Sequence, residues 1–172
     1  MDVLVNVVGI RPHKPVWEYD YDEWKHVFDV NLHSTFFLAK ALAPGMMQRK
    51  SGNIIALGAV LSLIARPHTA LETACKHGLY GLIKSIALDF GQYGIRANLL
   101  ILGNIENKRA NPERYPWEAR SKTETSGGGT RTLLMGRMGT SQDVANVALF
   151  LASDRSSYIT GDRIVCGGGK YM

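Results

Sequence analysis

The sequence is poor in cysteine and has no long apolar run. Cys75 and Cys166 are the only cysteines among 172 residues. Two isolated cysteines are typical of a reducing compartment and argue against a disulfide scaffold or a cysteine-rich metal site. No apolar stretch approaches the roughly 20 residues that a membrane-spanning helix needs, and no basic-then-apolar leader opens the chain. We therefore expect a cytoplasmic protein without a membrane partner.

The chain also lacks a concentrated charge of one sign. Its net charge is +5 and its pI is about 9.3. However, the densest basic segment, Lys108 to Arg120, also carries Glu113 and Glu118. No groove-reading motif accompanies this charge, so we expect no nucleic-acid partner. The histidines show no ligand spacing, so no metal site is predicted either.

A glycine-rich turn between a strand and a helix is missing as well. A glycine-rich run, Gly127 to Gly129, lies in a polar stretch from Asn104 to about Gly136. It therefore fails the context test for a dinucleotide-binding turn, and we interpret it as a hinge. Such a long polar connection predicts a loop that is functional or disordered.

Apolar patterning indicates that strands and helices alternate along the chain. Short β-branched or apolar runs predict strands at residues 2–10, 54–59, 95–102 and 162–169. Helical spacing predicts helices over about 20–48, 70–91 and 141–153, the last with Ser141 as its N-cap and Asp143 in its first turn. This order predicts one α/β domain over residues 1–172, with a parallel sheet and helices on both faces.

Several motifs in the same order resemble one enzyme family. They are "LVNVVG" (Leu4 to Gly9), "DVNL" (Asp29 to Leu32), "GNIIALGAVLSL", "ETACKHGLYGLIKSIALDFGQYGIRANLL" and "GRMGTSQDVANVALFLASDRSSYITG". Together they are similar to the short-chain dehydrogenase/reductase family of NAD(P)-dependent oxidoreductases. The resemblance implies a Rossmann-like fold and a nicotinamide cofactor, NAD or NADP. It also implies a homodimer or homotetramer that associates through the two long helices.

The resemblance assigns roles to individual positions. The family's catalytic asparagine and lysine fall on Asn31 and Lys76, whereas its catalytic serine and tyrosine fall on Ala59 and Glu72. The positions implied to contact the cofactor are Asn6, Gly9, Lys76, Gly103 and Ile105.

The two replacements alter the expected chemistry. Tyrosine and glutamate have ordinary pKa values of about 10 and about 4.3, and we expect Lys76 to hold Glu72 still more firmly as a carboxylate. Ala59 offers no hydrogen bond, and losing one such donor typically costs ~2.7–4 kcal/mol in the transition state. We therefore expect classical carbonyl reduction to be absent or slow. Two interpretations of Glu72 stay open: an i,i+4 ion pair with Lys76, or a general base in a non-redox lyase, isomerase or cyclase reaction.

The resemblance covers only the C-terminal two thirds of the family fold, since the chain opens at what would be the fourth strand. The segment "VLVNVV" would then be an apolar sheet edge. We expect either a fragment of a longer active oxidoreductase or an edge covered by a partner, and weak NAD(P) binding by this chain alone. A non-catalytic binding or scaffold subunit is a further alternative.

Overall fold

The computed structural model describes residues 1–106 and 134–169. The long predicted loop therefore falls mostly outside the described residues, together with its glycine run and its basic segment. The strands are β1 (Val3–Asn6), β2 (Gly52–Ala59), β3 (Ile95–Leu102) and β4 (Arg163–Cys166). The helices are α1 (Tyr21–Phe28), α2 (Ser34–Arg49), α3 (Ala70–Phe90) and α5 (Ser141–Ala152), a π-helix η2 (Asp29–His33), and the 3-10 turns η1 (Val16–Glu18), η3 (Val60–Ser62), η4 (Gly91–Tyr93) and η6 (Asp154–Ser156).

The four strands form one parallel sheet in the order β1-β2-β3-β4. Val3 pairs with Asn53, Gly52 with Ile95, and Leu99 with Arg163. Each pair is joined through a helix, as the alternation of elements along the sequence predicts. The expectation of a Rossmann-like parallel sheet is confirmed.

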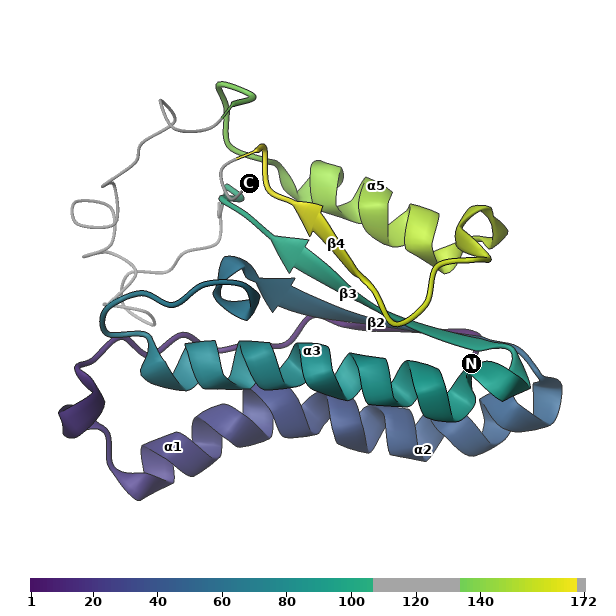
Figure 1. Ribbon diagram of the computed structural model, residues 1–172, viewed down its shortest axis with the longest axis horizontal. Coiled ribbons are helices and arrows are strands. Elements are labelled where there is room, and N and C mark those ends of the chain that lie inside the picture. Colours follow the sequence, from purple (N-terminus) through teal and green to yellow (C-terminus); the bar gives the residue numbers. More distant parts are fainter. Residues whose placement is uncertain (107–133, 170–172) are drawn as a thin grey trace.

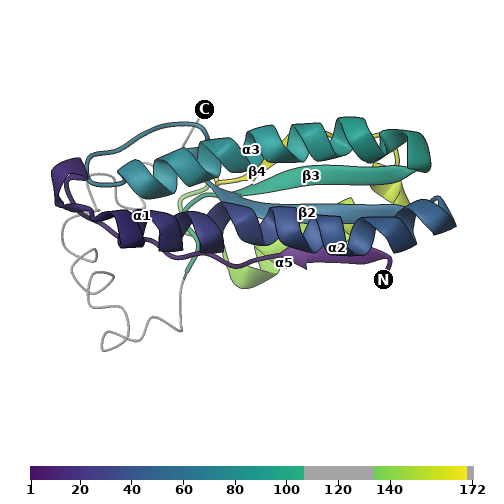
Figure 2. The same cartoon turned by 90° about the horizontal axis from the view of Figure 1, so that it is seen from below.

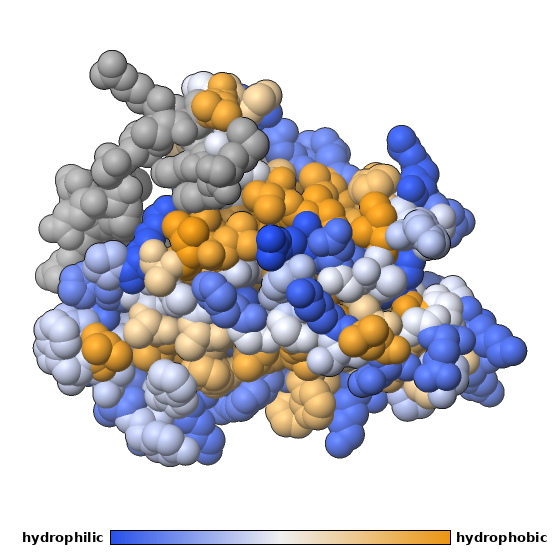
Figure 3. Space-filling model, in the orientation of Figure 1, coloured by the Kyte–Doolittle hydropathy of each residue, from blue (hydrophilic) through white to orange (hydrophobic). Residues whose placement is uncertain are grey.

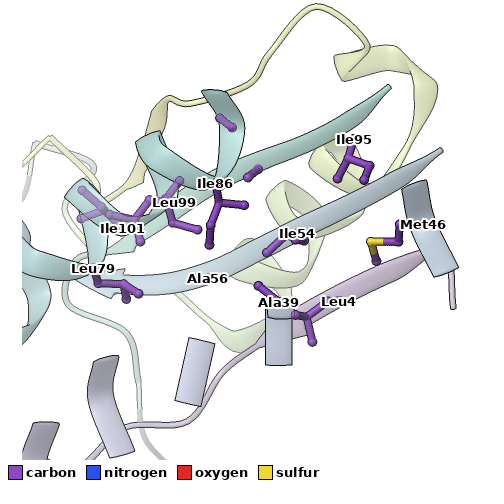
Figure 4. Close-up of a cluster of buried hydrophobic side chains, with 13 residues drawn as sticks. Leu4, Ala39, Met46, Ile54, Ala56, Leu79, Ile86, Ile95, Leu99 and Ile101 are labelled. Carbon is purple, nitrogen blue, oxygen red and sulfur yellow. The ribbon is translucent and has the colours of Figure 1, made fainter. Parts of the chain in front are cut away.

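Helices cover both faces of this sheet (Figures 1 and 2). The pair α2 and α3 packs on one face over the main apolar core, part of which Figure 4 shows, and α5 packs on the other. On the face viewed in Figure 3, apolar residues gather over β4 and α5, where Val165 is 46% exposed. The main core contains Leu4, Ala39, Met46, Ile54, Ala56, Leu79, Ile83, Ile86, Ala87, Ile95, Ala97, Leu99 and Ile101.

The strand β1 forms one border of the sheet. Among the described residues it pairs with β2 alone, and the cluster under α5 takes in Val3 but not Val5. The side chain of Val5 is consequently 41% exposed, and Val7 and Val8, just after the strand, are more exposed still. The strand is shorter than residues 2–10, because the chain leaves the sheet after Asn6.

The predicted single helix over residues 20–48 is wrong in its middle. A π-helix, Asp29–His33, separates α1 from α2. A π turn carries one more residue than an α turn and is frequent at functional sites. Here it places the side chain of Asn31 inside the protein, where it is 2% exposed.

The start of α5 also differs from the prediction by one residue. Its N-cap is Thr140 rather than Ser141, and Thr140 forms a reciprocal capping box with Asp143. The Arg137 guanidinium donates to the Asp143 carboxylate at 2.7 Å. This hydrogen bond and those from Thr140 hold the pKa of Asp143 well below its usual range. The cap shifts because threonine at position 140 already has the extended backbone that an N-cap needs.

Candidate active site

The predicted site residues meet at the carboxyl edge of the sheet. Gly9 follows β1, Ala59 ends β2 and Gly103 follows β3, while Asn31 and Lys76 approach from η2 and α3. In open parallel sheets, ligands bind beyond this edge. The fold therefore brings these positions, far apart in sequence, to the place where a ligand is expected.

Asn31 holds the segment after β1. Its Oδ1 accepts from the Ile10 backbone N–H at 2.9 Å, and its Nδ2 donates to the Ile10 carbonyl at 2.9 Å. A Cβ added to Gly9 would lie 3.1 Å from Asn31 Oδ1. The asparagine thus fixes the chain that runs past the site, and the absence of a side chain at Gly9 allows the close approach.

Lys76 reaches the same place from α3. Its Nζ donates to the Leu57 carbonyl at 2.8 Å, and a Cβ on Gly9 would lie 3.7 Å from it. Burial lowers the pKa of Lys76, although the nearby Glu72 carboxylate acts in the opposite direction. Lys76 is 6% exposed, so its amine is positioned by the protein and not by solvent.

Glu72 corrects one expectation from the sequence. Its side chain is buried, and burial raises the pKa of its carboxyl despite the attraction of Arg11, Lys76 and Arg66. Lys76 was expected to shift this pKa downward. Desolvation wins because the residue is only 4% exposed, and removing a carboxylate from water costs more than these cations return. Among the described residues no salt bridge joins Glu72 to Lys76, because the lysine amine bonds to Leu57 instead.

Ala59 presents only a methyl group at the end of β2. A hydroxyl does lie close by, on Ser62 of η3, and its Oγ accepts from the Ala59 backbone N–H at 3.4 Å. Ser62 is 3% exposed and packs against the position of Gly58, where an added Cβ would lie 2.9 Å from its Oγ. Ser62 is therefore engaged inside the protein and does not replace a hydroxyl at position 59.

The side chain of Asn6, a predicted cofactor contact, bonds within the protein. Its Nδ2 donates to Thr35 Oγ1 at 2.8 Å and to Ser34 Oγ at 3.1 Å, so it ties β1 to α2. Its Oδ1 accepts from the Val8 backbone N–H at 3.3 Å. The side chain of Asn6 thus has a structural role in this arrangement.

The two predicted contacts after β3 lie where the chain turns toward α5. A Cβ on Gly103 would lie 2.5 Å from Gly167 Cα, so two backbones touch there. Ile105 forms a parallel bridge with Gly139, just before α5. Glycine at position 103 is therefore required by this close contact between two segments of backbone.

Three residues near Glu72 escaped the sequence argument. Arg11 and Arg66 act on the pKa of Glu72 from the loops after β1 and η3. Tyr19 joins these loops, since its hydroxyl accepts from the Lys14 N–H at 3.0 Å and lies 3.4 Å from the His68 carbonyl. The spacing of motifs in the sequence does not predict these three residues, because loops bring them together only in the folded protein.

The described parts of the chain show neither a metal-binding cluster nor a membrane-spanning helix. No group of three histidine, cysteine, aspartate or glutamate side chains there could hold a metal ion. None of the helices described is both long and apolar enough to cross a bilayer.

Burial raises the pKa of Cys75 to about 12, so its thiol stays protonated.

Known proteins match this chain over nearly its whole length. The family model described as enoyl-(acyl carrier protein) reductase matches residues 1–170. The 3-oxoacyl-[acyl-carrier-protein] reductase FabG of Escherichia coli (strain K12) is 34% identical over 173 residues, covering 100% of this chain and 67% of its own. Dehydrogenase/reductase SDR family member 6 of Danio rerio is 31% identical over 178 residues, covering 98% of this chain and 69% of its own.

Solved structures agree with the sequence matches. A 3-oxoacyl-[acyl-carrier protein] reductase with bound NAD from Brucella melitensis has a TM-score of 0.84 at 33% identity, and the match covers 99% of this chain and 62% of that one. This chain spans about two thirds of the length of the relatives it matches. On the motifs, the fold and these matches, the chain belongs to the short-chain dehydrogenase/reductase family of oxidoreductases.

Proposed function

We propose that this chain is an oxidoreductase homologue whose classical NAD(P)-dependent hydride transfer between carbonyl and alcohol groups is lost or strongly impaired. The observation that carries the proposal is the pair Ala59 and Glu72 at the positions of the family's serine and tyrosine, beside a retained Asn31 and Lys76. A carbonyl oxygen at this edge would meet a methyl group and a buried carboxyl group instead of two hydroxyls. Hydride transfer then loses both its hydrogen-bond donor and its usual acid.

The described residues fit the nicotinamide end of a cofactor better than its pyrophosphate end. The edge where the nicotinamide ring and its ribose would lie is lined by Lys76 Nζ, by Gly9, and by the touching backbones of Gly103 and Gly167. In contrast, the described segment from β1 to α1 runs through η1 and forms no glycine-rich turn into a helix. A bound NAD(P)H would supply the hydride. We expect NAD or NADP to bind weakly to this chain alone.

The test separates cofactor binding from chemistry. NADH and NADPH binding is measured by fluorescence titration, and oxidation of both is followed with a panel of aldehydes, ketones and 3-oxoacyl thioesters. We expect no oxidation above the background rate. Reduction at rates typical of enzymes, with kcat of about 1 per second or more, refutes the proposal.

A double variant identifies the cause of any inactivity. A59S/E72Y restores both hydroxyls, and A59S/E72F is its matched control because it lacks only the phenolic oxygen. If the protein binds the cofactor, hydride transfer gained by A59S/E72Y and not by A59S/E72F assigns the loss to the missing phenolic hydroxyl at position 72.

The burial of Glu72 favours a second candidate function. A carboxyl group with a raised pKa, next to Lys76, has the poised basicity that a general base needs. We propose as the alternative a non-redox dehydration, isomerisation or cyclisation in which Glu72 takes the proton. Glu72→Gln should abolish such an activity while Glu18→Gln, on an exposed residue, leaves it intact. A silent Glu72→Gln removes this alternative.

We also propose that the chain forms a homodimer or homotetramer through α2 and α3. Phe36, Phe37 and Leu38 of α2 are 44%, 61% and 39% exposed. On α3, a Cβ added to Gly81 would meet nothing within 4 Å, so another helix has room to approach. The exposed aromatic surface on α2 and the small residue on α3 support packing of a second copy. An assembled but inert protein would fit a binding or scaffold role.

A further inference from the structure

The amine of Lys76 is buried without a carboxylate partner. Its side chain is 6% exposed, and among the described residues its Nζ makes one hydrogen bond, to the Leu57 carbonyl at 2.8 Å. None of the salt bridges in those parts of the chain includes Lys76. A backbone carbonyl accepts a hydrogen bond from an ammonium group and from a neutral amine alike. The contacts of Lys76 therefore do not require its charged form, and the neutral amine would keep its lone pair unused.

The charged and titratable groups around Lys76 do not compensate for its burial. On its own helix Glu72 and Cys75 favour the ammonium form, whereas Arg11 from the loop after β1 opposes it. The strand β2 contributes only the uncharged Leu57 carbonyl. Burial outweighs the favourable groups and lowers the pKa of the Lys76 amine. A desolvated lysine holds a larger neutral fraction than an exposed one, and the neutral amine is the nucleophilic form.

Gly9 opens a route from solvent to this amine. Gly9 is exposed, and a Cβ added to it would lie 3.7 Å from Lys76 Nζ. A side chain at position 9 would therefore contact the amine, and its absence leaves Nζ within reach from the sheet edge. Ala59 lies two residues after Leu57 on the same strand, is half-buried, and adds only a methyl group. A small molecule at this edge thus meets little side chain before it reaches the amine.

We propose that Lys76 is a nucleophile that condenses with a small ketone or aldehyde to form an imine, with Glu72 as the group that carries the protons. The proposal shares the sheet edge with the proposed function but goes beyond it, because it does not depend on the loss of hydride transfer. A buried amine next to a bare glycine provides the nucleophile and its access. A buried carboxyl group one helical turn earlier provides the proton carrier.

The condensation needs no oxidant and no reductant. The Nζ lone pair attacks the carbonyl carbon, a C–N bond forms, and the carbonyl oxygen takes up a proton. The C–O bond then breaks, and the two hydrogens of the amine leave with that oxygen as water. Glu72 fits the transfer of these protons because burial raises the pKa of its carboxyl, which can therefore give a proton to the oxygen and accept one from the nitrogen.

The test is incubation of the full chain with pentane-2,4-dione at neutral pH, followed by intact-mass measurement and peptide mapping. The imine of this diketone rearranges to a conjugated enaminone, which persists without a reducing agent. We expect a single adduct on the peptide that carries Lys76, with a mass gain of one diketone minus one water. The exposed Lys25 should react at least about tenfold more slowly, because it is not desolvated.

Variants separate the two roles. Lys76→Met removes the amine and should abolish the adduct, whereas Lys25→Met is the matched control and should keep it. Mapping of the wild type locates the adduct even if Lys76→Met fails to fold. Glu72→Gln should slow adduct formation by about a hundredfold, because it removes the proton carrier. If Glu72 acted only by favouring the ammonium form, the same variant would react faster, so an unchanged or faster rate overturns its role.

Two results would overturn the proposal for Lys76. One is the absence of any adduct, and the other is an adduct spread evenly over the exposed lysines. The assay contains no NADH or NADPH, so either failure leaves the proposed loss of hydride transfer untouched. Conversely, oxidation of NADH or NADPH at rates typical of enzymes refutes that proposed function and does not affect an adduct on Lys76.

Discussion

Replacing Glu72 by glutamine should stabilise the protein, and only above a certain pH. Glutamine has nearly the same shape as glutamic acid, but it carries no charge at any pH. Burial raises the folded-state pKa of Glu72 above the ordinary value of 4.5. The fold therefore prefers the protonated carboxyl. Arg11 and Lys76 attract the charged form, but the pKa of Glu72 stays raised in their presence.

The sign and size follow from proton linkage. Below the unfolded pKa both states are protonated, so wild type and variant have equal contributions from this position. As the pH rises through the folded pKa, the wild type must either bury a charge or hold a proton, and it loses stability. For each unit by which the folded pKa exceeds the unfolded pKa, the wild type loses about 1.36 kcal/mol of unfolding free energy at a pH above both values. Glu72→Gln avoids this loss.

Urea unfolding of both proteins across a pH range from about 4 to about 9 measures the effect. We expect the difference in the free energy of unfolding to be near zero in acid, to grow in favour of the variant, and to level off above the folded pKa. Glu18→Gln is the matched control, since it removes the carboxyl group of an exposed residue. A variant curve parallel to that of the wild type at every pH would refute the reasoning that burial governs Glu72.

Three further changes test two supports of the site and the proposed assembly. Asn31→Ala leaves the Ile10 backbone N–H and carbonyl without their partner and should cost about 1–3 kcal/mol of unfolding free energy by urea denaturation. Gly103→Ala places a methyl group against the Gly167 backbone, which has no flexible end to move, and should cost about 1–3 kcal/mol in the same assay. Phe37→Glu buries a charge if α2 packs against a second copy, so light scattering should report a smaller assembly.

Each of these changes has a control of matched chemistry. Asn146→Ala removes an asparagine whose Oδ1 accepts only an exposed hydrogen bond from Gln142. Gly91→Ala adds a methyl group where nothing lies within 4 Å and the backbone is right-handed helical. Tyr158→Glu places a charge on a fully exposed side chain outside the long helices. Equal effects in a variant and its control would contradict the corresponding prediction.

Elements with a regular apolar pattern were predictable from the sequence. The third strand was predicted at residues 95–102 and is found there, and the second long helix was predicted over 70–91 and ends at Phe90. In both, apolar residues are continuous or recur at one period. The first strand was predicted too long because Val7 and Val8 are apolar but exposed, and composition does not reveal where a chain leaves a sheet.

Positions in the site were predictable, but their surroundings were not. The motifs place Asn31, Ala59, Glu72 and Lys76 at one sheet edge, and the fold brings their elements there. The direction of the Glu72 pKa was missed, because sequence spacing reports a lysine four residues away but not how deeply a carboxyl is buried. The π-helix was missed because an inserted residue leaves the apolar period on either side intact.

The parallel sheet has a consequence for how the chain must fold. No two of the four described strands are joined by a hairpin: Val3 meets Asn53, Gly52 meets Ile95, and Leu99 meets Arg163. Every ladder therefore closes a loop of some forty residues or more before any strand pair forms, and such non-local closure slows folding. During that time the apolar strands that later fill the core are open to other chains. Synthesis in the cell should thus depend on chaperones more than the small size of the chain indicates, and refolding yield should fall steeply as protein concentration rises.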